Sequence, residues 1–591
     1  MSSLSEPGIR RPFRDRVSGF KRTAHDIAQK ARPLAARVWT LLLPPPPPIL
    51  PPYVRRRGGV IPALLRTAGL GLVVWFCYLY GQAFAMLGQW IILLMLVPLV
   101  ILALTVIWAL PATDRVPIRL ITALFMMSFV APAIWPEYLG YRPPGLPWLT
   151  LARVIIAPLA LLFLISVSTS QTFRTAMRRT LSADWTTSGF AIGYMLMAVA
   201  SVFWSVYASS TAESMIDFFL YFTLPFFAAC AIFQRRGGIT FWVRLLWGTA
   251  VFVSLIAIVE AHYQHVPWAG HIPAFLTIQD PAVQLSLMGF KRLWAEGYRA
   301  ESTIGNPMVC GEYLALALPF IIHSMFNEQK RVGRIAAIVS VPVVVLAIFD
   351  THARSGMGGA FTGVLLYALY WGMTKWRADR SSLLGPAVVA SYPVMALCAG
   401  LAVLFVGRLR RMIIGSGGTA SSNDARVTQW HSGWGAIMHR PWGYGWSTGA
   451  DVVGFHSPGG LLTIDSWILS TLVELGFFGL FVFLTLWLRA IYKTGLIALT
   501  TRTDTSDDHE LHFIAPVAVS LAAWLEIRTV LSELGNFGNA FVILAMGLAL
   551  MSRIKAAAAA PARHAPVEAP GPKWRMVGAL GMPGPGAVRP R

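Results

Sequence analysis

The sequence predicts an all-α polytopic membrane protein that has about fourteen transmembrane helices and one large loop in its C-terminal third. Of its 591 residues, 55% are hydrophobic and only 13% are charged, whereas a soluble globular protein is about 25% charged. Mean hydropathy is correspondingly high, at +0.59. Apolar runs of roughly 20 residues recur along the chain, and this is the length that an α-helix needs to cross a bilayer.

These runs divide the chain into two tails and a helical bundle. The N-terminal tail, residues 1–58, is basic and holds a proline-rich linker; its apolar residues recur by threes and fours, which predicts either an interfacial amphipathic helix or a disordered tail. The bundle is expected over residues 59–552, and the C-terminal tail, residues 553–591, is expected to be disordered. The predicted spans are residues 60–82, 86–110, 117–136, 149–168, 186–206, 213–233, 239–260, 304–325, 335–350, 356–373, 384–407, 464–488, 511–529 and 535–552.

Positive charge sets the expected orientation. Lys and Arg concentrate in four short connections, at residues 174–179, 234–238, 328–334 and 374–380. Such connections stay in the cytoplasm, and both tails fall on the same side. Three longer connections then face the periplasm, at residues 137–148, 261–303 and 408–463. The net charge of +22 sits largely in tails and short loops, which favours contact with anionic membrane lipids over nucleic acid.

Several function classes lack their sequence signatures. Neither a glycine-rich phosphate loop nor a dinucleotide-binding motif is present, so an ATP-driven pump and a cytoplasmic nucleotide-sugar transferase are not expected. The four cysteines lie in apolar segments, away from any Cys/His cluster, and we expect them to be small buried side chains. They are Cys77, Cys230, Cys310 and Cys398. We therefore predict neither a metal nor a cofactor.

Three arginines on the expected periplasmic side are candidates for binding phosphate. Arg299 precedes a span, Arg354 sits in a short turn between two spans, and Arg426 lies in the large loop. Positive charge is normally depleted on that side, and the planar guanidinium binds phosphate oxygens bidentately. Snorkelling or an ion pair at a helix cap would also account for them. The glycines beside them, in residues 305–307 and 354–359, permit close approach to a ligand but more commonly serve tight helix packing.

The large loop and the span after it carry aromatic and acidic candidates. Four tryptophans line the loop: Trp430, Trp434, Trp442 and Trp446. Most of them are expected in an interfacial belt, although tryptophans also stack on sugars. Asp465 begins the span, where it is either a helix N-cap or the base that takes a proton from an acceptor hydroxyl. Glu474 lies deeper and is expected to face the bundle interior.

Three segments together resemble the O-antigen ligase/polymerase superfamily of bacterial envelope glycosyltransferases, within roughly residues 150–552. HARSG (352–356) resembles the family's Ser/Thr-Arg-Ser-Gly turn, with Ala353 in place of the Ser/Thr. ARVTQWHSGWGAIMHRPWGYGWSTG (425–449) resembles a loop in which Arg and Trp precede Pro-x-x-Gly-x-Gly, although this chain has Pro-x-Gly-x-Gly. DSWILSTLVELGFFGL (465–480) resembles a span in which a polar residue precedes a Leu/Val-Glu-x-Gly-x-x-Gly run.

The resemblance implies a GT-C-like bundle that moves a glycan from undecaprenyl pyrophosphate to a hydroxyl group without a metal. Arg299, Arg354 and Arg426 would bind the pyrophosphate and stabilise the leaving group. Asp465 would be the base, and Trp430 would contact the glycan. Polymerases of this family usually work with a flippase and a chain-length regulator.

Ligases of the family usually have a histidine where this chain has Asp465. The sequence therefore favours a polysaccharide polymerase of the bacterial inner membrane, which joins lipid-linked repeats of an exopolysaccharide or O-antigen. A ligase that transfers the finished glycan to lipid A-core is the first alternative. A lipid-glycan flippase or another transporter is the alternative from a different class.

Overall fold

The computed structural model describes residues 116–142, 148–278, 298–405, 420–457, 460–501 and 508–559, with a few isolated positions besides. The chain divides into two compact units, Met1–Pro98 and Leu99–Arg591, and every element below belongs to the second. The predicted N-terminal tail, the spans at 60–82 and 86–110, and most of the C-terminal tail lie outside the described residues.

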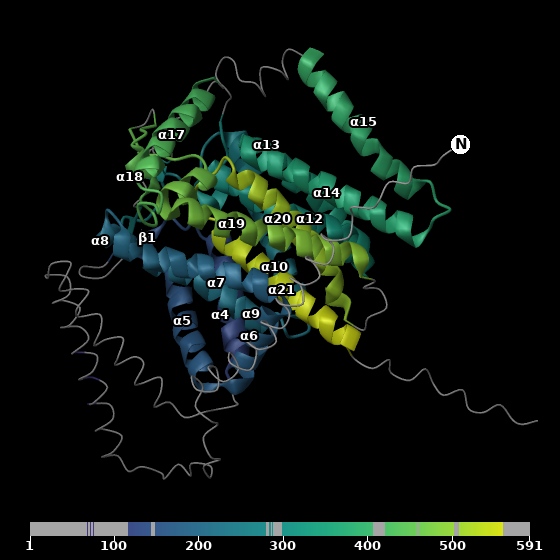
Figure 1. The fold of residues 1–591 in the computed structure, drawn as a ribbon, viewed down its shortest axis with the longest axis horizontal. Helices are drawn as coiled ribbons and strands as arrows, with labels where there is room; N and C mark the ends of the chain where they lie inside the picture. The colour runs from purple at the N-terminus through teal and green to yellow at the C-terminus, as the bar shows by residue number, and fades with distance from the viewer. Residues whose placement is uncertain are drawn as a thin grey trace, which may run out of the picture. The chain divides into compact units, whose positions relative to one another are not determined.

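The described chain is almost entirely helical (Figure 1). The α-helices are α4 (Ile118–Ile134), α5 (Leu151–Thr169), α6 (Gln171–Ala183), α7 (Trp185–Ala200), α8 (Ala208–Phe218), α9 (Leu224–Ile232), α10 (Gly238–Tyr263), α12 (Pro307–Asn327), α13 (Arg331–Asp350), α14 (Arg354–Ala378), α15 (Leu384–Phe405), α17 (Ala420–His439), α18 (Gly449–Val453), α19 (Trp467–Thr500), α20 (Ile514–Arg528) and α21 (Phe537–Ala559). Short helical turns cover η1 (Ser201–Trp204), η2 (Phe219–Thr223), η3 (Ser302–Ile304) and η6 (His509–Phe513).

Within the described residues, 9 helices or joined helices are long and apolar enough to cross a membrane. They comprise α5, α7 with η1, α8 through α9, α10, α12, α13, α19, η6 with α20, and α21. This confirms a polytopic helical membrane protein. Every predicted span from residue 117 onward coincides with a helix or with joined helices, because long apolar runs have no other way to satisfy their backbone groups in lipid.

Three short strands depart from the all-α prediction. Strand β1 (Gly140–Tyr141) pairs antiparallel with β2 (Leu149–Thr150) and with β3 (Leu276–Thr277), in the order β2-β1-β3. They belong to two connections that lie far apart in the sequence. Because the two connections run side by side, their backbone N–H and C=O groups satisfy one another.

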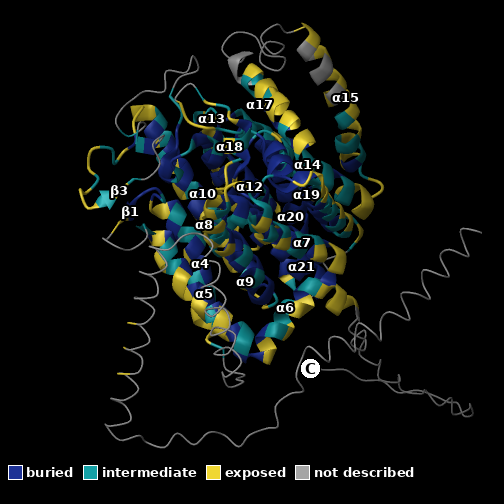
Figure 2. Cartoon of the chain, turned by 60° about the vertical axis from the view of Figure 1, so that its left-hand side comes forward, coloured by how far each residue is buried: buried dark blue, intermediate teal, exposed yellow. Residues whose placement is uncertain are grey.

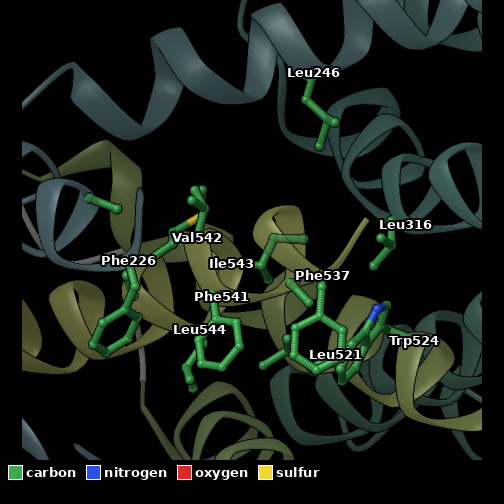
Figure 3. Close-up of a cluster of buried hydrophobic side chains, with 14 of the residues drawn as sticks. Phe226, Leu246, Leu316, Leu521, Trp524, Phe537, Phe541, Val542, Ile543 and Leu544 are labelled. Atoms are coloured by element: carbon green, nitrogen blue, oxygen red, sulfur yellow. The ribbon is translucent and has the colours of Figure 1, made fainter. Parts of the chain in front are cut away.

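Helices α12 and α20 form the interior of the bundle. Their apolar windows are each 83% buried, and a helix that is apolar on all sides belongs in an interior. Side chains from several helices fill the space around them, including Phe226, Leu521, Trp524, Phe537 and Phe541 (Figure 3). Figure 2 shows the buried residues gathered around these central helices, with exposed residues on peripheral helices such as α5 and α17.

Glycines allow the central helices to approach closely. A Cβ atom on Gly356 of α14 would lie 2.8 Å from the backbone of Gly311 in α12, and one on Gly359 would lie 2.3 Å from Cδ1 of Ile527 in α20. Residues 354–359 therefore serve helix packing, the commoner of the two expected uses. In residues 305–307, Asn306 is the N-cap of α12, and its Oδ1 accepts a hydrogen bond from Met308 N at 2.9 Å.

The bundle has a basic end and a loop end. At the basic end, Lys555 donates to the carbonyl of Ala183, Gln234 donates to Thr180, and Arg553 donates to the carbonyl of Phe233. Two of the basic connections predicted to share one side, at residues 174–179 and 234–238, thus lie beside the end of α21. The loop end carries the described parts of the longer connections, residues 135–142, 148–150, 264–278, 298–306, 440–457 and 460–466, together with the short turns at 351–353 and 529–536.

Residues 174–179 lie between two spans, as predicted, and this connection forms the amphipathic helix α6, in which Phe173, Thr180 and Ala183 make one buried face. Two details of the sequence prediction were wrong. The span predicted at 464–488 begins at Trp467 and runs on to Thr500. Cys398 is exposed on α15, whereas Cys230 and Cys310 are buried as expected; Cys77 lies outside the described residues.

Candidate active site

A break in α19 organises the loop end. At Gly476 the backbone leaves the helical conformation, with φ 73° and ψ −173°, so neighbouring backbone groups lose their partners within the helix. The loop at residues 441–445 replaces them. Tyr444 N donates to Val473 O at 2.9 Å and Gly445 N donates to Glu474 O at 2.9 Å, while Phe477 N donates to Pro441 O at 3.2 Å. The loop therefore completes the broken helix.

Glycine is required on both sides of this joint. A Cβ atom on Gly476 would lie 2.3 Å from Pro441 O, and one on Gly443 would lie 2.3 Å from Glu474 O. Both residues also have positive φ, which side chains rarely adopt. The Pro-x-Gly-x-Gly segment and the Glu-x-Gly segment, which both carry the family resemblance, are thus the two halves of one structural joint, which we call the loop–helix joint (residues 441–445 and 473–477).

Trp446 anchors the loop–helix joint in the bundle. Its side chain is only 1% exposed, and its ring packs 4.8 Å from Phe218 and 5.7 Å from Trp467, measured between centroids. Its backbone N–H donates to Ser201 Oγ at 3.0 Å, and its carbonyl accepts from Thr211 Oγ1 at 3.0 Å. Trp446 therefore belongs to the core and not to an interfacial belt.

Glu474 faces the bundle interior, as expected from its depth in the span. Its side chain is 5% exposed. Oε1 accepts hydrogen bonds from Ser470 Oγ at 2.8 Å and from Gly449 N at 3.3 Å. Gly449 is the first residue of α18, so Glu474 holds the segment after the loop–helix joint as well.

The joint returns the large loop to the bundle, and α17 then lies against the start of α19. Gly433 faces α19 so closely that a Cβ atom there would lie 2.8 Å from Leu469 Cδ1. Further along α17, Arg426 Nε lies 3.9 Å from Asp465 Oδ2, and both side chains are 32% exposed. Gln429 Oε1 accepts a hydrogen bond from Asp465 N at 2.9 Å. Residues about forty positions apart therefore meet at one point.

Asp465 is not the N-cap of α19. That position is Ser466, whose side chain accepts from Leu469 N at 3.4 Å. The carboxylate of Asp465 is consequently left to face Arg426. At 3.9 Å the two groups form an ion pair that is too long for a direct hydrogen bond.

Partial burial changes the pKa values of both groups in this pair. Burial raises the pKa of the Asp465 carboxyl above its ordinary 3.8, while Arg426 and Gln429 act in the opposite direction. Burial also lowers the pKa of Arg426, Asp465 opposes that change, and the nearby positive charge of Arg354 reinforces it. Arg426 nevertheless stays protonated, as arginine does in proteins.

Arg354 and Arg299 approach the same end from other elements. Arg354 is the first residue of α14, and its charge reaches Arg426. Arg299 Nε donates to Thr351 O at 3.2 Å, just before α14 begins. The structure thus gathers all three predicted arginines at the loop end. Trp430 lies one turn along α17 from Arg426, is 38% exposed, and makes none of these contacts.

Sequence reasoning missed a buried ion pair beneath this region. Arg528 Nη2 lies 2.6 Å from Glu312 Oε1, with both side chains fully buried. Asn536 Nδ2 donates to Glu312 Oε2 at 2.9 Å. The guanidinium lies over the rings of Trp467 and Trp524, 5.7 and 5.2 Å from their centroids. The signal was available, because ionisable residues inside predicted spans are rare and usually paired.

Comparison with known families adds to this geometry. Residues 335–484 match the family model of the O-antigen ligases. We refer to this similar stretch, residues 335–484, as the O-antigen ligase domain. The match runs from α13 to the middle of α19 and includes all three segments on which the resemblance was drawn, so it confirms the superfamily. No curated protein matches the sequence.

The O-antigen ligase domain includes Arg354, Arg426, Asp465 and the whole loop–helix joint, whereas Arg299 lies before it. Members of this family are glycosyltransferase-like enzymes of envelope glycan biosynthesis that use lipid-linked glycans in a membrane. Apart from Arg299, the candidate site therefore lies within the residues that are similar to these enzymes.

Replacing Gly476 with Ala should open the loop–helix joint. The new Cβ atom would overlap Pro441 O, and the residue would have to keep a positive φ, so we expect a loss of about 1–3 kcal/mol in the free energy of unfolding. Thermal unfolding in detergent would detect this loss, and limited proteolysis would report exposure of residues 440–457.

Gly495→Ala is the matched control, because a Cβ atom at that position of α19 would have only one ordinary contact, with Ala518 at 3.9 Å. It should be neutral or slightly stabilising. Wild-type thermal stability and protease resistance in Gly476→Ala would show that the joint is not required.

Proposed function

We propose that this protein is a polysaccharide polymerase of the bacterial inner membrane, with its loop end toward the periplasm. It transfers a glycan from undecaprenyl pyrophosphate to a hydroxyl group of another lipid-linked repeat. The observation that carries the proposal is the Arg426–Asp465 pair beside Arg354, inside the O-antigen ligase domain. The pair offers a cation for the leaving group and a base for the acceptor at one point.

The arginines are assigned to the pyrophosphate. Arg354 stands at the N-terminus of α14, where the helix dipole disfavours a cation, and it lies near the positive charge of Arg426. A bound dianion would relieve both costs. Two buried donors, Arg426 Nε and Gln429 Nε2, lack a hydrogen-bond partner among the described residues, and phosphate oxygens are suitable acceptors for them.

Asp465 is assigned as the base. The bond between the anomeric carbon and the pyrophosphate oxygen breaks, and the acceptor oxygen bonds to that carbon. The hydroxyl proton passes to Asp465, and undecaprenyl pyrophosphate leaves with its negative charge stabilised by the arginines. A pKa raised by burial makes Asp465 a stronger base than an exposed aspartate. The arginines supply the charge stabilisation that a metal supplies in other transferases.

A ligase is the second candidate, because the matched family model is described as that of O-antigen ligases. The two functions use the same donor and differ in the acceptor. Asp465 stands where the family's ligases usually have a histidine, and this difference favours the polymerase.

The deciding experiment uses the purified protein in lipid vesicles. Undecaprenyl-pyrophosphate-linked repeats are supplied with and without lipid A-core, and products are separated by size. A ladder formed from repeats alone supports the polymerase. A product that forms only with lipid A-core supports the ligase, and movement of repeats across the bilayer without any product would reject both.

Arg426→Lys tests how the donor is held. Lysine keeps the charge but loses the planar fork, so we expect activity to fall at least about 10-fold, the effect of one lost charge-assisted hydrogen bond. Initial rates with the lipid-linked donor would measure this fall. Wild-type rates in Arg426→Ala would contradict any role for Arg426 in binding pyrophosphate.

The pH dependence of the rate tests Asp465. As the base, Asp465 must be ionised, so the rate should rise with pH. The midpoint of this rise should lie above the ordinary aspartate pKa of 3.8, because burial raises the pKa of Asp465. Asp465→Asn should abolish that rise and most of the activity.

The same raised pKa predicts how stability changes. Ionising a partly buried carboxylate costs folding free energy, so the contribution of Asp465 is most favourable at low pH and is lost as pH rises through its folded-state pKa. Asp465→Asn should therefore retain its thermal stability at neutral pH. A variant that lost stability but kept its rate would mean that Asp465 has a structural role only.

A further inference from the structure

A buried carboxylate stands behind one of the proposed donor-binding arginines. Glu260, near the C-terminal end of α10, is fully buried. Its oxygens accept three hydrogen bonds, all from residues 298–302. Tyr298 Oη and Glu301 N donate to Oε1 at 2.7 and 3.0 Å, and Ser302 N donates to Oε2 at 2.6 Å. A buried carboxylate requires such donors, and here one short segment supplies them.

The segment held by Glu260 carries Arg299. On its other side the segment is attached to the turn before α14, because Ala300 N donates to Asp350 O at 3.1 Å and Arg299 Nε donates to Thr351 O at 3.2 Å. Arg354, the first residue of α14, follows three residues after Thr351. The segment therefore connects the end of α10 to the turn that bears the second arginine.

The conformation of this segment requires support from its surroundings. Ser302 has φ 53°, in the left-handed region, which costs a non-glycine residue free energy and persists only where neighbouring groups enforce it. Both groups that hold Ser302 lie on α10. They are Glu260, which binds its N–H, and Val253, whose carbonyl accepts from Ser302 Oγ at 2.9 Å. Thr303 Oγ1 adds a bond to Ala133 O at 2.7 Å.

We propose that Glu260 is a positioning residue that holds Arg299 in place for the lipid-linked pyrophosphate. The inference rests on the proposed function, because it assumes that Arg299 binds the donor. Arginine side chains are long, so the position of the guanidinium depends on the backbone that carries it. Without Glu260, two backbone N–H groups and the Tyr298 hydroxyl would lose their buried acceptor, and the segment would shift. A displacement of about 1 Å at a substrate-binding group can lower rates 100-fold.

Glu260→Gln tests this role with little change in volume. Glutamine keeps one acceptor oxygen but turns an NH2 group toward a backbone donor, so the segment loses part of its support. We expect kcat/KM for the undecaprenyl-pyrophosphate-linked repeat to fall by about 10- to 100-fold. Ser254→Ala is the control on the same helix, since Ser254 is also fully buried and its hydroxyl lacks a hydrogen-bond partner in the described structure. That variant should keep wild-type activity.

Donor binding separates a positioning role from a general structural one. The affinity for undecaprenyl pyrophosphate is measured from the concentration dependence of its thermal stabilisation of the protein, in wild type, Glu260→Gln, Arg299→Ala and the double variant. If Glu260 acts through Arg299, the double variant binds no more weakly than Arg299→Ala alone. An additional loss in the double variant, or unchanged affinity and rate in Glu260→Gln, overturns the proposal. Wild-type rate and affinity in Arg299→Ala would instead refute the role of Arg299 in the proposed function, and with it this inference.

Discussion

The break of α19 at Gly476 is the constraint on which the loop end depends. A helix interrupted inside a membrane protein leaves backbone groups that water cannot satisfy, and only another backbone segment of suitable shape replaces their partners. The loop at residues 441–445 does so, with glycine at both points of contact. Because that loop follows α17 directly, the joint also fixes where α17 lies. The approach of Arg426 to Asp465 is thus a consequence of backbone hydrogen bonding more than of the 3.9 Å ion pair itself.

The charges of the protein fall into two kinds. Some are buried and paired within the bundle, as in the Glu312–Arg528 pair, where an ion pair, an amide donor and aromatic rings surround the two groups. Burying such a pair without these partners would be strongly unfavourable. The charges at the candidate site differ, because Arg426 and Asp465 are partly exposed and too far apart for a hydrogen bond. Charged groups of this second kind can still form hydrogen bonds or ion pairs with a charged substrate. Glu260 links the two kinds, since it is buried and hydrogen-bonded yet holds a segment that bears a site arginine.

The sequence predicted the spans well and their irregularities poorly. Apolar runs near 20 residues in length have one stable solution in lipid, so α5, α10, α12 and α21 follow from composition and length. The helical conformation of the connection that forms α6 was not predicted, because the connection was interpreted from its basic residues and not from its amphipathic pattern. The two glycine-bearing motifs of the loop–helix joint were noticed in the sequence, but their contact was not predicted. They lie some thirty residues apart, and nothing in either motif indicates that its backbone binds the other. A glycine inside an apolar span was the one available hint of a break.

For the site, the sequence by itself determined which residue types were candidates. The sequence alone shows arginines on the expected periplasmic side, where positive charge is normally depleted, a carboxylate at the start of a span, and the order of three motifs. The match to the O-antigen ligase family model over residues 335–484 agrees with these observations. Only the tertiary structure shows which candidates lie close together. It also shows that Ser466, and not Asp465, caps α19 and that Trp446 is a core residue. The support that Glu260 gives to the segment of Arg299 is likewise visible only there. The physical reason is that composition and periodicity report each helix separately, whereas these relations arise from backbone groups and charges that distant segments must satisfy for one another.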